Sequence, residues 1–479
     1  MATGRTVIAP EAVGTTGAPL DLELTDAWAI DPATGRSGPA DLVVQAGRLE
    51  SIVWRDEGRG ARNRVPAVVV APGFIDLHAH LREPGGEEAE TIATGLAAAA
   101  HGGFTTVCAM PNTNPPIDDP AVLAWLETAS ARAGSPVLLR PYACVSLRRA
   151  GETLAPLGAL ADAGAVAFSD DGSPVASPGL LRSALLYAAE LARVVVDHPE
   201  DRALTEGAEA NDDLVGTVLG LPGWPAAAEV AAVERDLAVL ADVVRDARNA
   251  RLHLTHVSTR GALDAIRRAK ARGLPVTCDI TPHHLSLADE WLAGARRWAW
   301  EAIDADGRSR DPWRDEALVA PPFDTSLRVN PPLRSAEDAV ACLAALADGT
   351  VDAVATDHAP HGAVAKEVEF GAAANGIIGL ETTLGTLLEA VATGRLTLER
   401  AIAALTAGPA SVLGRALDRS PGLIEGEPAD FVVFDRSSSW RVSEATLRSR
   451  SRNTPLLGRD LPGRVLLTVA DGRLAYAAS

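Results

Sequence analysis

Eight short apolar runs recur along the middle of the chain, and most are followed by a stretch with helical periodicity. The helical stretches include "EEAETIATGLAAAAHGG", which ends at glycine, and "AAAEVAAVERDLAVLADVVRDARNA". Strands that alternate with helices in this way predict an α/β fold built as a (β/α)8 barrel. The alternative is an open doubly wound sheet, but the glycine signatures of Rossmann and P-loop folds are missing. The eight runs are "GFIDLHAHL", "FTTVCAMPN", "VLLRPYACVS", "AVAFSDD", "RVVVDHPE", "LHLTHVS", "PVTCDITPHH" and "VDAVATDHAPH".

The two ends of the chain carry strand patterns instead of helical ones. "DLVVQAGRLESIVW" alternates apolar and polar residues around a glycine turn, and "GLIEGEPADFVVFD" and "GRVLLTVADGRLAYA" look similar near the C-terminus. Neither end has enough strands to be stable alone. We therefore expect residues 1–72 and 416–479 to form one small β-sandwich domain beside a catalytic barrel at 73–415.

One segment departs from the alternating pattern. Residues 288–326 follow the seventh run and hold four of the nine tryptophans, surrounded by charges and prolines. We interpret this segment as an insertion into the barrel. It could serve as a lid, an oligomer contact or an added surface subdomain, and the last two are favoured because most insertions stay away from the chemistry.

The net charge and the cysteine pattern argue against certain partners and cellular compartments. A net charge of −19 argues against a nucleic acid or an anionic membrane surface as partner. We find no signal peptide and no apolar run long enough to span a bilayer. Cys108, Cys144, Cys278 and Cys342 show no C-x-x-C pairing, which favours buried thiols in a reducing cytoplasm.

Polar residues with metal-binding chemistry stand at or just after the C-terminal ends of the apolar runs. In a (β/α)8 barrel these ends form the active-site face, so strands far apart in sequence deliver their side chains to one mouth. Imidazoles and carboxylates are costly to bury unless they are paired or bind a cation, so we expect a divalent metal there. The residues are His78, His80, Asn112, Asp170, Asp171, His198, His256, His283, His284, Asp357 and His361.

Eight sequence motifs, which contain most of these residues, together resemble those of one family. In chain order, the sequence resembles the dihydroorotases of the amidohydrolase superfamily, and most closely their bacterial, aspartate-bridged type. The resemblance implies a metal-dependent barrel that reversibly converts L-dihydroorotate to N-carbamoyl-L-aspartate in pyrimidine synthesis. The motifs are "APGFIDLHAHLREPG", "TTVCAMPNTNP", "AFSDDG", "DHPED", "LTHVST", "ITPHHL", "NPPLRS" and "ATDHAPH".

The resemblance assigns metal ligands motif by motif. His78, His80 and Asp357 are expected to hold a first ion, and His198 and His256 a second ion. Asp171 is expected to bridge them, in preference to Asp170, because neighbouring strand residues point to opposite faces. Many relatives bridge two metals with a carboxylated lysine instead, but no lysine precedes Lys270 in this chain. Zn²⁺ suits such ligands best, with Mn²⁺ or Co²⁺ as alternatives and one or two ions per subunit.

The resemblance also assigns catalytic and substrate-binding roles. Asp357 is expected to be the general base, although it could be a metal ligand alone. Arg82 can bind a substrate carboxylate bidentately. Asn375 and Gly376 stand where relatives often carry an aromatic–glycine pair whose backbone meets the substrate, so backbone contacts survive here while apolar packing on the ring does not. The remaining expected substrate contacts are Asn112, Asn330 and His361.

Two other functions stay open at this point. One is a different cyclic amidase, such as an allantoinase or hydantoinase, although Arg82 with Asn112 favours a carboxylated substrate. The other is a scaffold that assembles with aspartate carbamoyltransferase, but such chains lack metal ligands that this one keeps. An active enzyme that also binds this carbamoyltransferase, or that forms a homo-oligomer, is compatible with the sequence.

Overall fold

All eight apolar runs form strands in the computed structural model, which describes residues 17–55 and 66–478. The strands pair in parallel as two sheets, with orders β5-β6-β7 and β14-β13-β12-β9-β8. Parallel bridges from Ala143 to Phe168 and from Ala79 to His358 join these sheets into a closed ring, which confirms the predicted barrel. Its strands are β5 (Phe74–Ala79), β6 (Phe104–Ala109), β7 (Leu138–Pro141), β8 (Ala167–Ser169), β9 (Val194–Asp197), β12 (Leu252–Leu254), β13 (Val276–Ile280) and β14 (Ala353–Val354).

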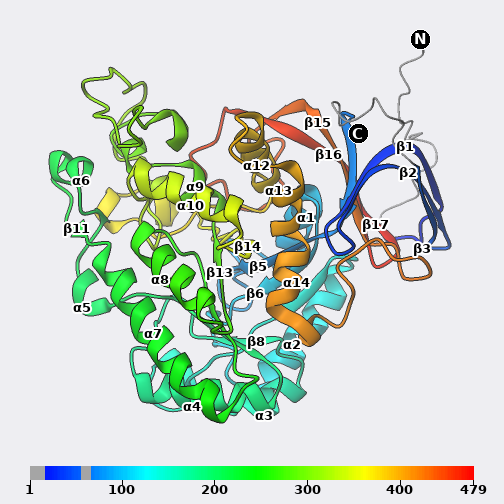
Figure 1. Ribbon diagram of the computed structural model, residues 1–479, viewed down its shortest axis with the longest axis horizontal. Coiled ribbons are helices and arrows are strands. Elements are labelled where there is room, and N and C mark those ends of the chain that lie inside the picture. The colour runs from blue at the N-terminus through cyan, green and yellow to red at the C-terminus, as the bar shows by residue number, and fades with distance from the viewer. Residues whose placement is uncertain (1–16, 56–65, 479) are drawn as a thin grey trace.

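Helices surround this ring on the outside (Figure 1). The two stretches singled out as helical form α1 (Ile92–Gly102) and α7 (Ala227–Asp246). Threonine or serine caps several N-termini, as Thr91 does for α1 and Thr259 for α8. The other helices of six or more residues are α2 (Pro120–Ala133), α3 (Leu157–Asp162), α4 (Pro178–Glu190), α6 (Leu214–Leu219), α8 (Arg260–Ala271), α10 (Ala336–Asp348), α12 (Thr383–Ala392), α13 (Leu398–Leu405) and α14 (Ala407–Leu413).

Shorter elements lie in the connections. None of the helices within residues 17–55 and 66–478 combines the length and the apolar character that crossing a bilayer requires. The four cysteines are buried free thiols. The short elements are α5 (Arg202–Thr205), α9 (Pro282–Ser286), α11 (Ala363–Lys366) and a ladder of β10 (Ala210–Asn211) with β11 (Gly223–Trp224).

Strands from both ends of the chain form the second domain, as predicted. They make one seven-stranded sheet of order β17-β16-β15-β4-β1-β2-β3, whose neighbours are antiparallel except for β1 and β4. Alternate residues such as Leu22, Leu42, Phe431 and Val469 fill a core of its own. The strands are β1 (Leu22–Asp31), β2 (Arg36–Gln45), β3 (Arg48–Trp54), β4 (Val68–Pro72), β15 (Phe431–Arg441), β16 (Asp460–Ala470) and β17 (Arg473–Ala477). The parts of the expected domain at 1–16, 56–65 and 479 lie outside the described residues.

The two domains meet where β4 continues into β5. Gly73 is the only residue between these strands, and a Cβ there would overlap the Thr105 side chain and the Asp430 carboxylate. Asp430 also accepts a hydrogen bond from the Thr105 hydroxyl at 2.6 Å and pairs with Arg419. The first barrel strand therefore starts from a fixed point on the terminal sheet.

The segment at 288–326 lies between α9 and α10, after the seventh barrel strand, as expected for an insertion. Trp291, Trp298 and Trp300 are buried within it, and the rings of Trp298 and Trp300 stack at 5.4 Å. The guanidinium of Arg459 lies 3.8 Å from the centre of the Trp298 ring. The insertion is therefore a packed unit that contacts the loop between β15 and β16.

Candidate metal centre and substrate pocket

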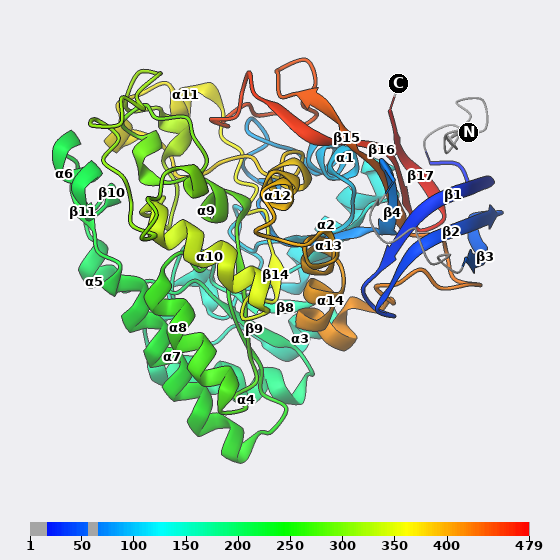
Figure 2. The ribbon, with the colours of Figure 1, turned by 45° about the horizontal axis from the view of Figure 1, so that its top comes forward.

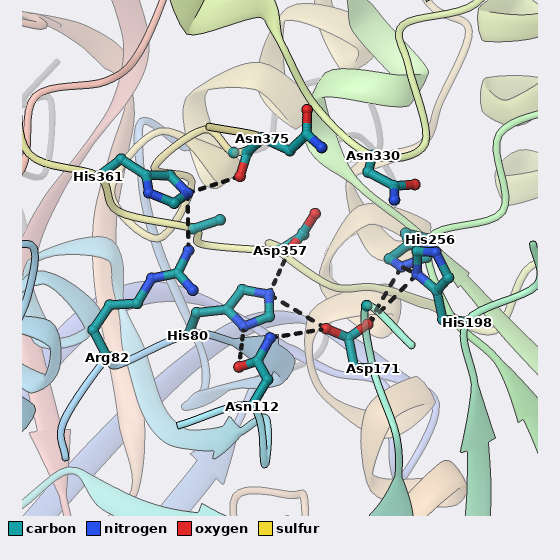
Figure 3. A pocket seen from close by; sticks show the side chains of 13 residues that line it. His80, Arg82, Asn112, Asp171, His198, His256, Asn330, Asp357, His361 and Asn375 are labelled. Carbon is teal, nitrogen blue, oxygen red and sulfur yellow. Dashed lines mark hydrogen bonds and ion pairs between the residues drawn. The ribbon is translucent and has the colours of Figure 1, made fainter. Parts of the chain in front are cut away.

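Six side chains from five barrel strands converge at the C-terminal mouth of the barrel, and Figure 3 shows all of them except His78. His78 lies on β5 and His80 just after it, and the others follow the ends of their strands. All six are buried, with at most 6% of their surface exposed. These are six of the eleven residues that the strand-end rule selected, and they are the six that the resemblance assigned as metal ligands: His78, His80, Asp171, His198, His256 and Asp357.

The Asp171 carboxylate lies between two pairs of histidines. Its Oδ2 is 3.5 Å from His78 Nε2 and 3.7 Å from His80 Nε2. Its Oδ1 is 3.7 Å from His198 Nδ1 and 3.6 Å from His256 Nε2. Each oxygen thus faces one pair. The Asp170 carboxylate points toward Ser146 instead, and it accepts hydrogen bonds from the backbone N–H and the hydroxyl of that residue.

In three of the histidine rings, the outer nitrogen, which faces away from Asp171, is hydrogen-bonded. This hydrogen bond fixes whether the inner nitrogen, which faces Asp171, carries a lone pair. The Thr255 hydroxyl donates to Asp279, so it accepts from His78 Nδ1 at 2.8 Å. His80 Nδ1 donates to the Asn112 amide oxygen at 3.0 Å, and His198 Nε2 donates to Glu200 at 2.9 Å. The unprotonated nitrogen of each ring therefore points toward Asp171, as a metal ligand requires.

This arrangement fits divalent metal ions. His78 Nε2 and His80 Nε2 are 3.2 Å apart, so without a proton between them their two lone pairs face each other and need a shared cation. The Asp171 Oδ1 atom is buried without any hydrogen-bond partner. Imidazole nitrogens and carboxylate oxygens are a donor set that zinc-like ions prefer. Two groups that share Asp171 can each hold an ion, namely His78 with His80 and His198 with His256.

Asp357 lies beside the histidines of the first group. Its Oδ1 is 3.0 Å from His80 Nε2 and 3.5 Å from His78 Nε2. Asp357 and His256 both adopt a left-handed backbone, with φ of 44° and 38°. Non-glycine residues rarely adopt such angles, and they do so where the surrounding structure enforces them. The strained backbone turns these two side chains into the mouth at the point where their strands end.

Two buried carboxylates below the mouth hold this backbone in place. Asp76 accepts hydrogen bonds from the Thr356 backbone at 2.8 Å and from the Thr356 hydroxyl at 2.6 Å. Asp279 accepts the backbone N–H of His256 at 2.6 Å and His253 Nε2 at 2.8 Å. Each carboxylate therefore fixes the chain at or next to a metal-ligand candidate on another strand.

The pKa values follow the charges at the centre. Burial alone would raise the pKa of the Asp171 carboxyl, but its three nearest imidazoles outweigh burial and hold it well below its usual range. Burial disfavours a charged His78 ring, yet Asp171 and Asp357 outweigh it and raise the pKa of His78 to about 9. The buried carboxylates thus demand positive charge nearby, which protons or a divalent cation can supply.

A cavity of about 210 Å³ opens above the centre and is lined by every predicted substrate residue. His361 Nε2 is 2.8 Å from the Asn375 carbonyl oxygen and 3.1 Å from Arg82 Nη2. The carbonyl can only accept a hydrogen bond and the guanidinium can only donate one. His361 Nε2 therefore bonds to the Asn375 carbonyl when it carries a proton and to Arg82 when it does not, but not to both at once. Burial and the nearby Arg82 lower the pKa of His361 to about 3, so this ring is neutral. The predicted substrate residues are Arg82, Asn112, Asn330, His361, Asn375 and Gly376.

On the far side of the cavity, Asn330 offers an unused acceptor. Its Nδ2 donates to Glu200 Oε2 at 3.3 Å, whereas its Oδ1 is buried and has no partner. Buried amide oxygens are normally hydrogen-bonded. Asn330 Oδ1 is thus placed to accept an N–H from a bound molecule.

Comparisons with known proteins agree with this geometry. A family described as "Dihydro-orotase-like" matches residues 67–262. A protein named dihydroorotase from Anaeromyxobacter dehalogenans (strain 2CP-1 / ATCC BAA-258) is 45% identical over 93% of this chain and 96% of its own. Another from Citrifermentans bemidjiense is 40% identical over 94% and 98%. The chain belongs to the dihydroorotase family.

Solved structures of the same fold extend the comparison. An L-hydantoinase from Arthrobacter aurescens matches with a TM-score of 0.75 and 23% identity, over 95% of this chain and 96% of that one. A D-hydantoinase matches with a TM-score of 0.72 and 21% identity, over 96% and 95%. At this identity the likeness concerns the fold alone, a (β/α)8 barrel with a β-sandwich domain.

Four supporting residues of this dihydroorotase-family site were missed by sequence reasoning: Asp76, Glu200, Thr255 and Asp279. A signal was available for three of them. Asp76 and Asp279 are charged residues inside otherwise apolar runs, where an unpaired carboxylate is costly. Glu200 follows His198 at the same two-residue spacing that separates His78 from His80. Thr255 has no comparable signal.

Glu200→Gln should weaken metal binding. The neutral amide accepts a weaker hydrogen bond from His198 Nε2, so the ring is held less firmly and is less basic. Loss of such an outer partner typically costs about 10–100-fold in metal affinity. Competition with a chelator measures this loss. Asp201→Asn is the matched control, because Asp201 is the adjacent carboxylate and caps α5. Equal affinity of Glu200→Gln and wild type would contradict the role given to Glu200.

Proposed function

We propose that this chain is a dihydroorotase that reversibly hydrolyses L-dihydroorotate to N-carbamoyl-L-aspartate in de novo pyrimidine biosynthesis. The observation that carries the proposal is one cavity lined by the Arg82 guanidinium and by Asp171, His80, His198 and His256 of the candidate metal centre, in a chain of the dihydroorotase family. The metal pairs suit amide hydrolysis, and the guanidinium suits a carboxylated substrate.

We propose Zn²⁺ as the metal, with Mn²⁺ or Co²⁺ able to replace it. His78, His80 and Asp357 would hold one ion, His198 and His256 the other, and Asp171 both. When bound, the metal supplies Lewis-acid chemistry, which makes water acidic enough to attack at neutral pH and polarises the amide carbonyl. Because the outer nitrogens of His78, His80 and His198 are already hydrogen-bonded, these three rings need little reorganisation to bind.

Asp357 is proposed as the general base. Its carboxylate lies in the cavity wall, and burial is outweighed by His78 and His80, which keep its pKa below the usual range and the group ionised. It would take a proton from the attacking water and return it to the ring nitrogen as the C–N bond breaks. The same carboxylate serves both directions of the reversible reaction.

The remaining residues would orient the substrate. Arg82 would bind the substrate carboxylate together with His361 and with the Asn112 amide N–H₂, since the Asn112 oxygen is taken by His80. Asn330 Oδ1 would accept a ring N–H. The backbone at Asn375 and Gly376 would form the remaining wall, where a side chain at 376 would overlap Ala359.

Several wider expectations belong to the same proposal. The barrel at 73–415 would be the catalytic domain and the two terminal segments would form its companion. The buried free thiols support a reducing cytoplasm as its location. Light scattering on the purified chain tests for a homo-oligomer, and co-purification with aspartate carbamoyltransferase tests for that partner.

A direct assay tests the proposal. The purified chain is offered L-dihydroorotate, N-carbamoyl-L-aspartate, hydantoin and allantoin, with and without a chelator. We expect chelator-sensitive turnover of the first two alone. Turnover of hydantoin or allantoin instead would keep the reaction class and refute the substrate. If metal is bound and all four stay inert, also with aspartate carbamoyltransferase present, the enzymatic proposal fails.

Asp357→Asn should lose activity while the protein stays folded. A neutral amide cannot accept the proton, and loss of general-base catalysis costs about 10²–10⁴-fold in kcat. Metal content, measured in parallel, separates the two roles of Asp357: lost metal would assign the defect to ligation. Turnover near the wild-type rate would contradict the base assignment.

Arg82→Ala should raise KM for L-dihydroorotate by about 10–100-fold, the worth of a charge-assisted hydrogen-bond pair, at full metal content. Steady-state kinetics with metal analysis measures both quantities. Arg182→Ala, which removes a surface arginine paired with Asp242, is the control. An unchanged KM would mean that another group binds the carboxylate.

A further inference from the structure

The loop between β15 and β16, residues 442–459, leaves the terminal domain and reaches the barrel mouth (Figure 2). Ser451 Oγ donates to the Ala89 carbonyl at 2.7 Å, and the Arg450 backbone donates to the Glu90 carboxylate at 3.0 Å. Glu90 in turn contacts His358, the residue after Asp357, at 3.3 Å. The loop is thus fixed to the connection after β5 and close to the metal centre.

Asn453 is the point where this loop meets the substrate pocket. It is 5% exposed and all polar atoms of its side chain are used. Its Oδ1 accepts the backbone N–H of His361 at 3.0 Å. Its Nδ2 donates to the carbonyl oxygens of Ala359 at 2.9 Å and Gly376 at 3.0 Å. One amide therefore joins the segment after β14 to the segment that carries Asn375 and Gly376.

One joined segment carries His361, a proposed contact of the substrate carboxylate, and the other carries Asn375 and Gly376, which form a wall of the pocket. His361 touches both Arg82 and the Asn375 carbonyl, as described above, so its ring position sets the spacing between them. Asn453 is not among the residues that line the cavity. It holds His361 and Gly376 from behind and does not reach the substrate space.

We propose that Asn453 is a positioning residue for the substrate carboxylate, supplied to the barrel by the terminal domain. The inference rests on the proposed function, because it assumes that Arg82 binds a carboxylate. The site requires both an acceptor and a two-hydrogen donor, which an asparagine amide provides and an aspartate carboxylate does not. An aspartate at 453 would place negative charge within 3.0 Å of two carbonyl oxygens and would push the two segments apart.

A double-mutant cycle with Asn453→Asp and Arg82→Ala tests the inference. If Asn453 acts through the Arg82 clamp, Asn453→Asp raises KM for L-dihydroorotate by about 10-fold or more and changes kcat by less than about 3-fold. The same substitution then changes kcat/KM by less than about 3-fold when Arg82 is already alanine, because coupled residues are not additive. Metal content stays full. Leu457→Ala, an exposed position of the same loop, is the control and leaves KM unchanged.

Several outcomes would overturn the inference. An unchanged KM, a fall in kcat alone, lost metal or additive effects in the cycle would each show that Asn453 does not act on the clamp. If Asn453→Asp does not fold, Asn453→Ser keeps one donor and one acceptor on a shorter side chain and takes its place in the cycle. Wild-type protein that fails to turn over L-dihydroorotate refutes the proposed function instead, so the two failures are distinguishable.

Discussion

A buried carboxylate that faces four imidazoles is the constraint on which the barrel mouth depends. Asp171 divides its two oxygens between two histidine pairs, and neither oxygen comes closer than 3.5 Å to any of the four ligand nitrogens. That separation is too long for good hydrogen bonds and leaves room for ions between the groups. Burying so much unsatisfied charge requires positive charge nearby, which protons or a divalent cation can supply. The fit of the mouth to metal ions therefore follows from the same contacts that fix the ends of five strands.

Three further carboxylates support this centre through hydrogen bonds. Asp76 and Asp279 hold the backbone of neighbouring strands, while Glu200 contacts both His198 and Asn330. One carboxylate thus links a metal-ligand candidate to a substrate-facing amide. The positions of the metal centre and of the pocket are consequently coupled, because a shift of His198 would move Glu200 and release Asn330.

The sequence could predict the barrel because each strand is a short apolar run with a polar residue at its end, and this signal is local. It predicted strand bounds less well. The last run, "VDAVATDHAPH", gives only the two-residue β14, because regular pairing is interrupted around Asp357 and resumes as a single bridge from Ala79 to His358. His78 and His80 stood out through their spacing. Asp171 comes from the family resemblance, and strand alternation adds only that one of Asp170 and Asp171 can face the ions. Asn453 could not be found, because it lies 92 residues from His361 in a loop without periodicity.

The contact between Asn453 and His361 gives the composite terminal domain a structural role at the pocket. A barrel alone can place metal ligands at its strand ends, but the segments after β14 are long and need an anchor to hold a small substrate. Asn453 supplies that anchor from outside the barrel, and Arg459 of the same loop stacks on the tryptophans of the insertion. Both the substrate wall and the insertion therefore depend on one loop of the terminal sheet. Because only Gly73 separates β4 from β5, that sheet joins the barrel directly at the strand that carries His78 and leads to His80.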